Sequence, residues 1–319
     1  MTLLQESSSQ KPHESYRHEA LLYRGEDEFV AGTVPFIREG LAAGQPIMVA
    51  VIAAKIARLR AELGPDADRV TYVDMAALGG NPARIIPAWR EFVDEHAVTG
   101  QPIRGIGEPI WAGRRESEVL ECQLHEALLN LAVDPDTPLW LRCPYDVGAL
   151  DRDVLAEAER SHPVLVEETS YTGSTLYGGV HHASAAFDHD LAEPTVAVVE
   201  LAFGASGLPA VRDVVTGRAT LLEIDRDRVS DLALAVHELA TNSLRHGGGR
   251  GLLRVWQEPD ALVCEVHDSG RVEDPLVGRR TPSLSQQGGR GVWMANQLCD
   301  LVALRSSEHG TTVRVSTWL

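Results

Sequence analysis

One predicted helix carries a carboxylate and an amide at a spacing that could serve chemistry. Glu238 and Asn242 lie four residues apart in the segment 235–249, which ends in three consecutive glycines. This spacing places both side chains on one face of a helix, one turn apart. A carboxylate can accept the proton of a hydroxyl group or of water, and an amide oxygen suits the hard cation Mg²⁺. The pair therefore predicts half of a functional site.

Two later stretches could supply the other half. Asp268 and Gly270 end an apolar strand expected over 262–267, and the glycine-rich run 288–291 precedes a helix expected over 292–299. The aspartate can accept a hydrogen bond from the exocyclic amine of adenine, and the glycine lets the base approach the backbone. Exposed N–H groups at the start of a helix favour phosphate. Together with the first helix, these stretches predict an ATP site.

The elements that must position these residues indicate an α/β sandwich over 191–319. Apolar and polar residues alternate in the later strands, as expected for a sheet with one exposed face. Amphipathic helices would cover the other face. The expected strands are 195–203, 251–257, 262–267, 301–306 and 311–317, and the expected helices are 208–216, 227–245 and 292–299.

The first half of the chain has a different pattern, in which apolar strands without polar alternation are each followed by a helix. Such strands are typical of a parallel sheet covered on both faces, so we predict a doubly wound, mostly parallel α/β domain over 16–165. Residues 1–15 are polar and are expected to be a disordered tail. Residues 166–190 are rich in turn-forming residues and are expected to be a solvated linker.

Sites in such a sheet lie beyond the carboxyl ends of its strands. Glu108 and Trp111 follow one strand, His18 precedes the first strand, and His125 belongs to a helix expected over 116–132. This order of elements and motifs resembles the MEDS sensory domain over about 15–165. The resemblance implies sensing of a small molecule or another signal, with these four residues as candidates. The alternative is that they cap strands and fill a polar rim.

The composition excludes several classes of function. With 29 basic and 46 acidic side chains the formal charge is −17, which argues against nucleic acid or a membrane surface as the main partner. Residues 1–15 contain no hydrophobic signal sequence, so a cytoplasmic protein is expected. The cysteines are far apart in the sequence and are interpreted as reduced core residues: Cys122, Cys143, Cys264 and Cys299.

The second half contains three sequence motifs: Glu238 with Asn242, Asp268 with Gly270, and the glycine-rich run 288–291. In this order they resemble the GHKL superfamily with its Bergerat ATP-binding fold, and most of all the anti-sigma factor serine kinases. The resemblance implies a protein that sequesters a sigma factor and phosphorylates a STAS-domain anti-anti-sigma partner, with ATP and Mg²⁺ as cofactors. The matching positions imply Glu238 as the base, Asn242 as the Mg²⁺ ligand, Asp268 and Gly270 as adenine contacts, and Gly289 and Gly291 as phosphate contacts, with Arg245 and Arg290 as further phosphate candidates.

The sequence leaves one other function open and argues against a second. The first glycine box of the family usually reads Asp-x-Gly-x-Gly, and Val272 replaces its second glycine. This departure favours an ATP-gated binding module without kinase turnover. A sensor histidine kinase would need a pair of long helices before the ATP domain, and 161–225 shows no such pattern. The identity of the sigma factor, the signal and the oligomeric state, a homodimer included, stay open as well.

Overall fold

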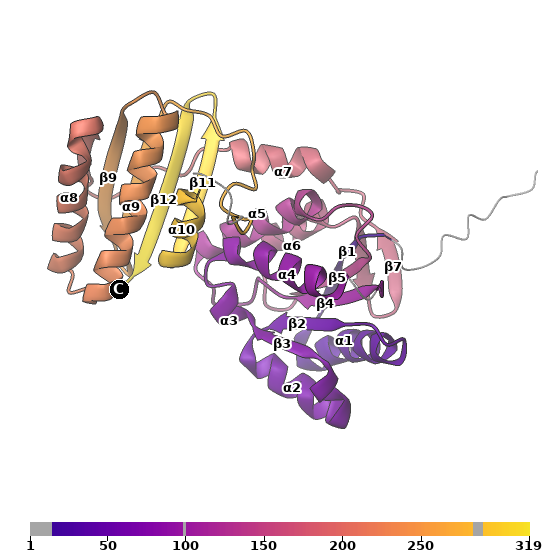
Figure 1. Cartoon of the computed structure of the whole chain (residues 1–319). Coiled ribbons are helices and arrows are strands. Elements are labelled where there is room, and N and C mark those ends of the chain that lie inside the picture. The colour runs from indigo at the N-terminus through magenta and orange to yellow at the C-terminus, as the bar shows by residue number, and fades with distance from the viewer. Residues whose placement is uncertain (1–14, 98–99, 283–289) are drawn as a thin grey trace, which may run out of the picture.

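The computed structural model describes residues 15–97, 100–282 and 290–319, which form two α/β units in chain order (Figure 1). The first unit is built around a seven-stranded sheet and the second around a five-stranded sheet. No helix within these ranges is long and apolar enough to cross a membrane. All four cysteines are buried and none is in a disulfide, as expected for reduced core residues.

The sheet of the first unit has the strand order β3-β2-β4-β5-β1-β6-β7, and every neighbouring pair is parallel except β6 with β7. All five residues of β2 and all five of β4 are buried, which explains why these strands lack polar alternation. The predicted doubly wound sheet is confirmed. The strands are β1 Arg17–Tyr23, β2 Ile47–Val51, β3 Thr71–Asp74, β4 Ile103–Gly107, β5 Leu139–Asp146, β6 Val164–Glu167 and β7 Ser170–Gly173.

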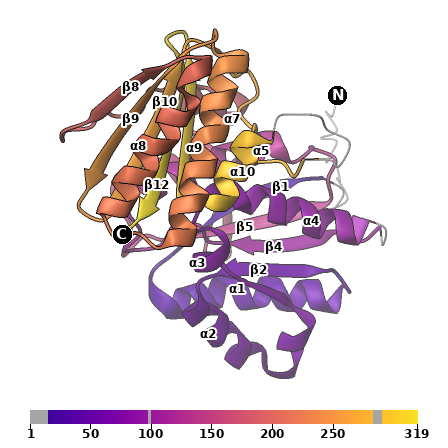
Figure 2. The same ribbon diagram turned by 60° about the vertical axis from the view of Figure 1, so that its left-hand side comes forward.

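Helices cover both faces of this sheet (Figure 2). Phe29 and Ile37 of α1 pack with Leu59 of α2 on one face, and Trp89 of α4 packs with Leu128 of α5 on the other. The helices are α1 Gly25–Ala42, α2 Ala53–Leu63, α3 Met75–Leu78, α4 Ile85–Ala97, α5 Glu116–Ala132 and α6 Arg152–Ser161, with 3₁₀ turns at η1 Gly64–Arg69 and η2 Pro82–Arg84.

The segment 166–190 is not an irregular linker, so that expectation was wrong. It contains most of the β6–β7 hairpin and α7 Gly179–Asp188, which packs against α5 and β11. Ala183 and Phe187 of α7 are four residues apart and buried, the first in the core of the first unit and the second in that of the other. This pair is too short a pattern to stand out among many turn-forming residues, and only tertiary packing stabilises the helix.

The second unit has an entirely antiparallel sheet in the order β11-β12-β10-β9-β8, with α8, α9 and α10 on one face (Figure 2). Arg254, Glu265 and Arg314 form an ion-pair ladder across its strands. The predicted α/β sandwich is confirmed. Its elements are β8 Val199–Phe203, η3 Ala205–Gly207, α8 Leu208–Leu221, α9 Arg226–His246, β9 Gly251–Glu258, β10 Ala261–Asp268, α10 Gly291–Leu298, β11 Leu301–Ser307 and β12 Gly310–Trp318.

The helix α9 is fixed at both ends. The side chain of Asp225 caps its start by accepting a hydrogen bond from the N–H group of Asp227. Leu232, Val236 and Leu239 follow the helical period and are buried against the sheet. At the other end, a Cβ atom on Gly247 would lie 2.2 Å from Cγ of Asp268, so the chain leaves the helix where only glycine fits.

Candidate functional site

The carboxylate of Asp268, at the end of β10, is held in one orientation by two donors. The hydroxyl group of Ser243 on α9 donates to Oδ2 at 2.6 Å, and the N–H group of Gly270 donates to Oδ1 at 2.8 Å. Each carboxylate oxygen keeps a further lone pair for another donor. A Cβ atom on Gly270 would lie 2.6 Å from the carbonyl oxygen of His246, so this close turn requires glycine. The geometry creates a fixed acceptor at the edge of a cavity.

That cavity has a volume of about 280 Å³ and lies between α9, β10, β12 and the start of α10. Its wall is mostly apolar, and its polar lining residues include Asp268, Ser243 and Thr311. Such a cavity suits a flat ring that has one polar edge. The lining residues are Leu239, Asn242, Ser243, His246, Val266, Asp268, Gly270, Arg271, Val272, Val277, Val292, Leu304, Thr311 and Val313.

Two residues of this site were missed by sequence reasoning. Ser243, the first of them, is buried on the apolar side of α9, where a serine gives no signal of a site. Thr311 pairs with Asp268 across the sheet, and its hydroxyl group donates to the carbonyl oxygen of Gly270 at 2.9 Å. The hydroxyl group of Ser306 is 2.9 Å from that of Thr311. Thr311 follows a glycine turn, which was the available signal, but its pairing with Asp268 depends on the strand order.

The predicted polar pair on α9 faces the first residue of α10. Glu238 and Asn242 are both half-buried, and a Cβ atom on Gly291 would lie 2.7 Å from Nδ2 of Asn242 and 3.4 Å from Cβ of Glu238. The start of α10 therefore touches this face, and a Cβ atom at position 291 would require the amide of Asn242 to move. Within the described ranges, neither polar side chain has a hydrogen-bond or ion-pair partner.

The remaining predicted contacts lie around this position. Arg245 is exposed in the last turn of α9, and Arg290 is exposed immediately before α10. The structure therefore brings Glu238, Asn242 and Gly291 together and places the two arginines at the end of α9 and the start of α10. Gly289 lies outside the described residues.

Val272 fills the position of the second glycine without strain. Its N–H group donates to the hydroxyl group of Ser306 at 2.8 Å, and its side chain packs on the core beside the cavity. Among the described residues other than glycine, only Glu168 and Glu223 have a positive φ. The backbone at Val272 therefore does not need glycine in this conformation.

The first unit holds the far end of α10. The guanidinium group of Arg84 donates to the carbonyl oxygens of Asn296 and Cys299 at 2.7 and 2.9 Å, and the amide of Asn81 donates to Asn296 Oδ1 at 3.1 Å. Carbonyl groups at the end of a helix lack partners within it and carry partial negative charge. A cation and an amide from the first unit therefore cap the helix whose other end reaches Asn242.

A buried ion-pair triad makes a second contact between the units. Glu121 of α5 is 3.2 Å from Arg279 and 2.6 Å from Arg305, and all three residues are buried. Arg279 belongs to the segment between β10 and α10, and Arg305 belongs to β11. The carboxylate of the first unit thus compensates two buried cations of the second, one of them in the segment that leads to α10.

The sensory candidates of the first unit do not form one site. Glu108, at the carboxyl edge of the sheet, accepts a 2.6 Å hydrogen bond from Tyr23 and pairs with Lys55. Burial raises the pKa of Glu108, and the Lys55 charge partly opposes this shift. Trp111 is half-buried and stacks with Arg114.

The two histidines lie elsewhere. His18 is five residues before Tyr23 on β1, which corresponds to about 17 Å along a strand. It binds Glu126 in a separate buried cluster. His125 is buried on α5, and burial lowers its pKa to about 3, so it is neutral near pH 7.

Comparison with known proteins agrees with this division. Residues 17–163 match MEDS, the methanogen/methylotroph DcmR sensory domain, and residues 205–317 match the histidine kinase-like ATPase domain. No curated protein matches the chain. A crystal structure of the RsbU and RsbW domains of a Mycobacterium tuberculosis protein is similar at 15% identity with a TM-score of 0.30. That match covers 38% of this chain and 32% of the other, so this chain spans about a third of its length.

Proposed function

Because a MEDS domain over 17–163 precedes a histidine kinase-like ATPase domain over 205–317, we propose that this chain is an ATP-binding anti-sigma factor with serine/threonine kinase activity. In this proposal it acts in the bacterial cytoplasm in a partner-switching pathway. It sequesters a sigma factor and phosphorylates a STAS-domain anti-anti-sigma protein. The MEDS domain regulates both actions in response to a ligand or another signal.

The observation that carries the proposal is the convergence of Glu238, Asn242 and the start of α10 beside the cavity that ends at Asp268. The apolar wall would hold the adenine ring, and the oriented Asp268 carboxylate would accept a hydrogen bond from the exocyclic amine of adenine. The start of α10 would receive the phosphates, where the helix dipole and unpaired N–H groups favour negative charge. Each group needed for a nucleotide is thus supplied by a different element.

The residues present also suit Mg²⁺. Asn242 offers a neutral amide oxygen that has no hydrogen-bond partner among the described residues, and such an oxygen is a ligand that Mg²⁺ accepts alongside water and phosphate. When bound, the ion would neutralise charge on the phosphates. Arg245 and Arg290 are placed to add positive charge at the end of α9 and the start of α10.

Glu238 is the group that would act on the protein substrate. It lies one turn before Asn242 and has no partner among the described residues, so its carboxylate can accept a proton from a serine or threonine hydroxyl group. The oxygen of that hydroxyl group would then attack the terminal phosphorus of ATP, the bond between this phosphorus and the bridging oxygen would break, and ADP would leave. Arg245, exposed one turn beyond Asn242, would stabilise the charge on that phosphate.

The contacts between the units provide a route for regulation. Arg84 and Asn81 of the MEDS domain cap one end of α10, and Gly291 at its other end touches Asn242. A shift of the MEDS domain would therefore move the phosphate-facing end of α10 relative to Glu238. This part of the proposal requires two positions of α10, each favoured by a different state of the MEDS domain.

A second candidate function is an ATP-gated binding module that captures its partner without phosphorylating it. The observation that favours it is Val272, which packs on the core where the kinases have a flexible glycine. A less flexible segment after Asp268 would still permit nucleotide binding and would limit closure over the phosphates.

The two functions are separated by incubating the full-length protein with labelled ATP, Mg²⁺ and candidate STAS-domain proteins. If the protein is a kinase, we expect label to be transferred to a serine or threonine of a partner. Glu238→Gln should abolish this transfer and keep the affinity for the nucleotide. Asp227→Asn, an exposed change at the other end of α9, is the matched control and should retain transfer. ATP binding without transfer to any partner would support the binding module, and absence of ATP binding would contradict both.

A further inference from the structure

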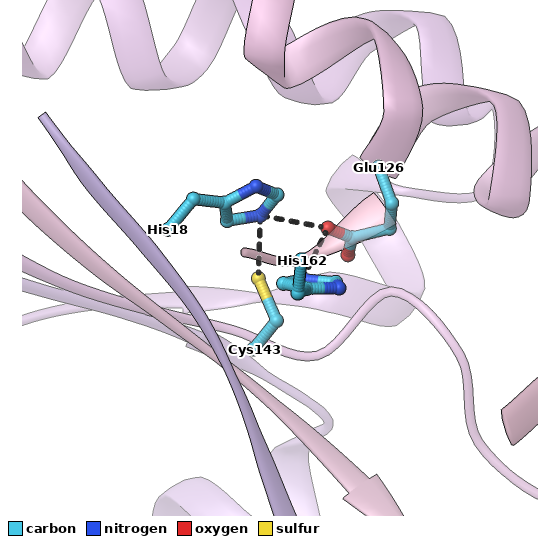
Figure 3. Close-up of side chains that lie close together, drawn as sticks. All are labelled: His18, Glu126, Cys143 and His162. Atoms are coloured by element: carbon cyan, nitrogen blue, oxygen red, sulfur yellow. Dashed lines mark hydrogen bonds and ion pairs between the residues drawn. The ribbon is translucent and has the colours of Figure 1, made fainter. Parts of the chain in front are cut away.

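Four side chains from distant parts of the first unit converge in its interior. They are His18 on β1, Glu126 on α5, Cys143 on β5 and His162 immediately after α6 (Figure 3). One nitrogen, oxygen or sulfur atom of each lies within 4.8 Å of all the others, and all four residues are buried. These atoms are Nε2 of both histidines, a carboxylate oxygen of Glu126 and Sγ of Cys143.

The outer nitrogen of each ring has an acceptor that fixes the position of its proton. Nδ1 of His162 is 2.8 Å from the carbonyl oxygen of Ala158, which can only accept. Nδ1 of His18 is 3.2 Å from Oδ1 of Asn130, whose amide nitrogen donates to the carbonyl oxygen of Ser161 at 2.8 Å. Both rings therefore carry hydrogen on Nδ1 and turn the lone pair of Nε2 inward.

Three of the inner atoms are consequently acceptors, namely Nε2 of each ring and the carboxylate oxygen of Glu126. The neutral thiol of Cys143 offers one proton, and its Sγ is 3.5 Å from Nε2 of His18. Nε2 of His18 is 3.1 Å and Nε2 of His162 is 3.3 Å from the same oxygen of Glu126. Buried acceptors that outnumber the donors facing them are costly, and a cation among them removes that cost.

We propose that His18, Glu126, Cys143 and His162 bind one divalent transition-metal ion, Zn²⁺ fitting best. Two imidazole nitrogens, one thiolate and one carboxylate make a four-ligand donor set that suits Zn²⁺ and does not suit Mg²⁺ or Ca²⁺. On binding, the Cys143 thiol gives its proton to solvent and forms a sulfur–metal bond, so two ligand charges of −1 balance the ion. The acceptors on Nδ1 are the outer partners that orient metal-bound histidines.

The position of the site joins it to the rest of the molecule. Glu126 lies five residues after Glu121 on α5, and Glu121 pairs with Arg279 and Arg305 of the second unit. The metal would therefore link β1, β5 and the end of α6 to the helix that carries the interdomain ion pairs. This inference concerns only the first unit and stands whether or not the second unit proves to be a kinase.

The test uses the full chain, stripped with a chelator and then titrated with Co²⁺ followed by Zn²⁺. We expect one Co²⁺ per chain, an absorption band from thiolate-to-cobalt charge transfer, and loss of the band when Zn²⁺ displaces Co²⁺. Cys143→Ser should abolish the band. Asn130→Ala, which removes an outer partner, should keep the band and weaken affinity about 10–100-fold.

Cys122→Ser is the matched control, because Cys122 is fully buried in the same unit, donates only to the carbonyl oxygen of Pro109 and is outside the cluster. It should keep the band unchanged. Circular dichroism of each variant separates loss of binding from loss of folding, and Asn130→Ala keeps all four ligands if Cys143→Ser fails to fold. Absence of Co²⁺ uptake, or a band that persists in Cys143→Ser, would overturn the metal site.

Discussion

The hydroxyl group of Ser243 on α9 donates a 2.6 Å hydrogen bond to Oδ2 of Asp268 at the end of β10. This bond orients the carboxylate that would recognise adenine. Ser243→Ala should therefore lower nucleotide affinity by about 10- to 150-fold, because a hydrogen bond to a charged group contributes about 1.5–3 kcal/mol. Titration with a fluorescent ATP analogue measures the change. Ser230 is an exposed serine near the start of the same helix, so Ser230→Ala should leave nucleotide affinity unchanged. Equal effects of the two substitutions on affinity would contradict the role of Ser243.

Asn242 should affect nucleotide binding only through Mg²⁺. Its amide oxygen is the proposed ligand, so Asn242→Ala should weaken ATP binding about tenfold when Mg²⁺ is present, equivalent to about 1.4 kcal/mol. With a chelator in place of Mg²⁺, wild type and variant should bind alike. Calorimetric titration under both conditions gives the comparison. A similar loss with and without Mg²⁺ would show that Asn242 contacts the nucleotide directly.

Gly247 is required by the closeness of α9 to Asp268. A Cβ atom there would lie 2.2 Å from Cγ of Asp268, so Gly247→Ala must displace the carboxylate or the helix end. We expect a loss of about 1–3 kcal/mol in the free energy of unfolding, together with impaired nucleotide binding. Chemical denaturation measures the first quantity. Gly217→Ala in α8, where a Cβ atom meets nothing within 4 Å, should instead stabilise by up to about 1 kcal/mol.

The buried triad of Glu121 predicts strong coupling between the two units. Glu121→Gln leaves Arg279 and Arg305 buried without a compensating charge, which should cost about 3–5 kcal/mol. Thermal unfolding should then separate into two transitions, because the contact between the units is lost first. Glu116→Gln, an exposed change on the same helix, serves as the control and should leave the profile unchanged. A single unshifted transition in Glu121→Gln would refute the coupling.

His125 should make the protein sensitive to mild acid. Burial lowers its pKa from 6.5 to about 3, so the unfolded chain takes up a proton below pH 6.5 that the folded chain does not accept until about pH 3. The free energy of unfolding should therefore fall across this window as the pH is lowered, by at most about 1.4 kcal/mol per pH unit for this group.

Burial also lowers the pKa of His18, which acts in the same direction, so His125→Gln should remove part of the slope and leave the remainder. Denaturant unfolding at a series of pH values provides the measurement. His309→Gln, at an exposed turn, should retain the full slope. A slope that is unchanged in His125→Gln would show that the buried ring does not titrate as described.

The local elements of this protein could be predicted from its sequence. The four-residue spacing of Glu238 and Asn242, the apolar stripe of Leu232, Val236 and Leu239, and the glycine after His246 were enough to predict α9 and its polar face. The apolar strands and crossover helices likewise indicated the parallel sheet. These patterns are readable because side chains three or four residues apart on a helix, or two apart on a strand, share a face whatever the rest of the chain does.

The contacts between distant elements were decided only by the tertiary structure. Thr311 lies beside Asp268 because β12 pairs with β10, and Ser243 reaches Asp268 because α9 packs on β10. Glu121 contacts Arg279 and Arg305 because the two units pack together. The helix α7 was missed because it is stabilised by packing against the cores of both units, and its own sequence has no clear helical pattern. The cluster of His18, Glu126, Cys143 and His162 forms because β5 and β6 flank β1 in the sheet. The order of the strands in a sheet determines which distant residues are in contact, and the local periodicity of a sequence does not show that order.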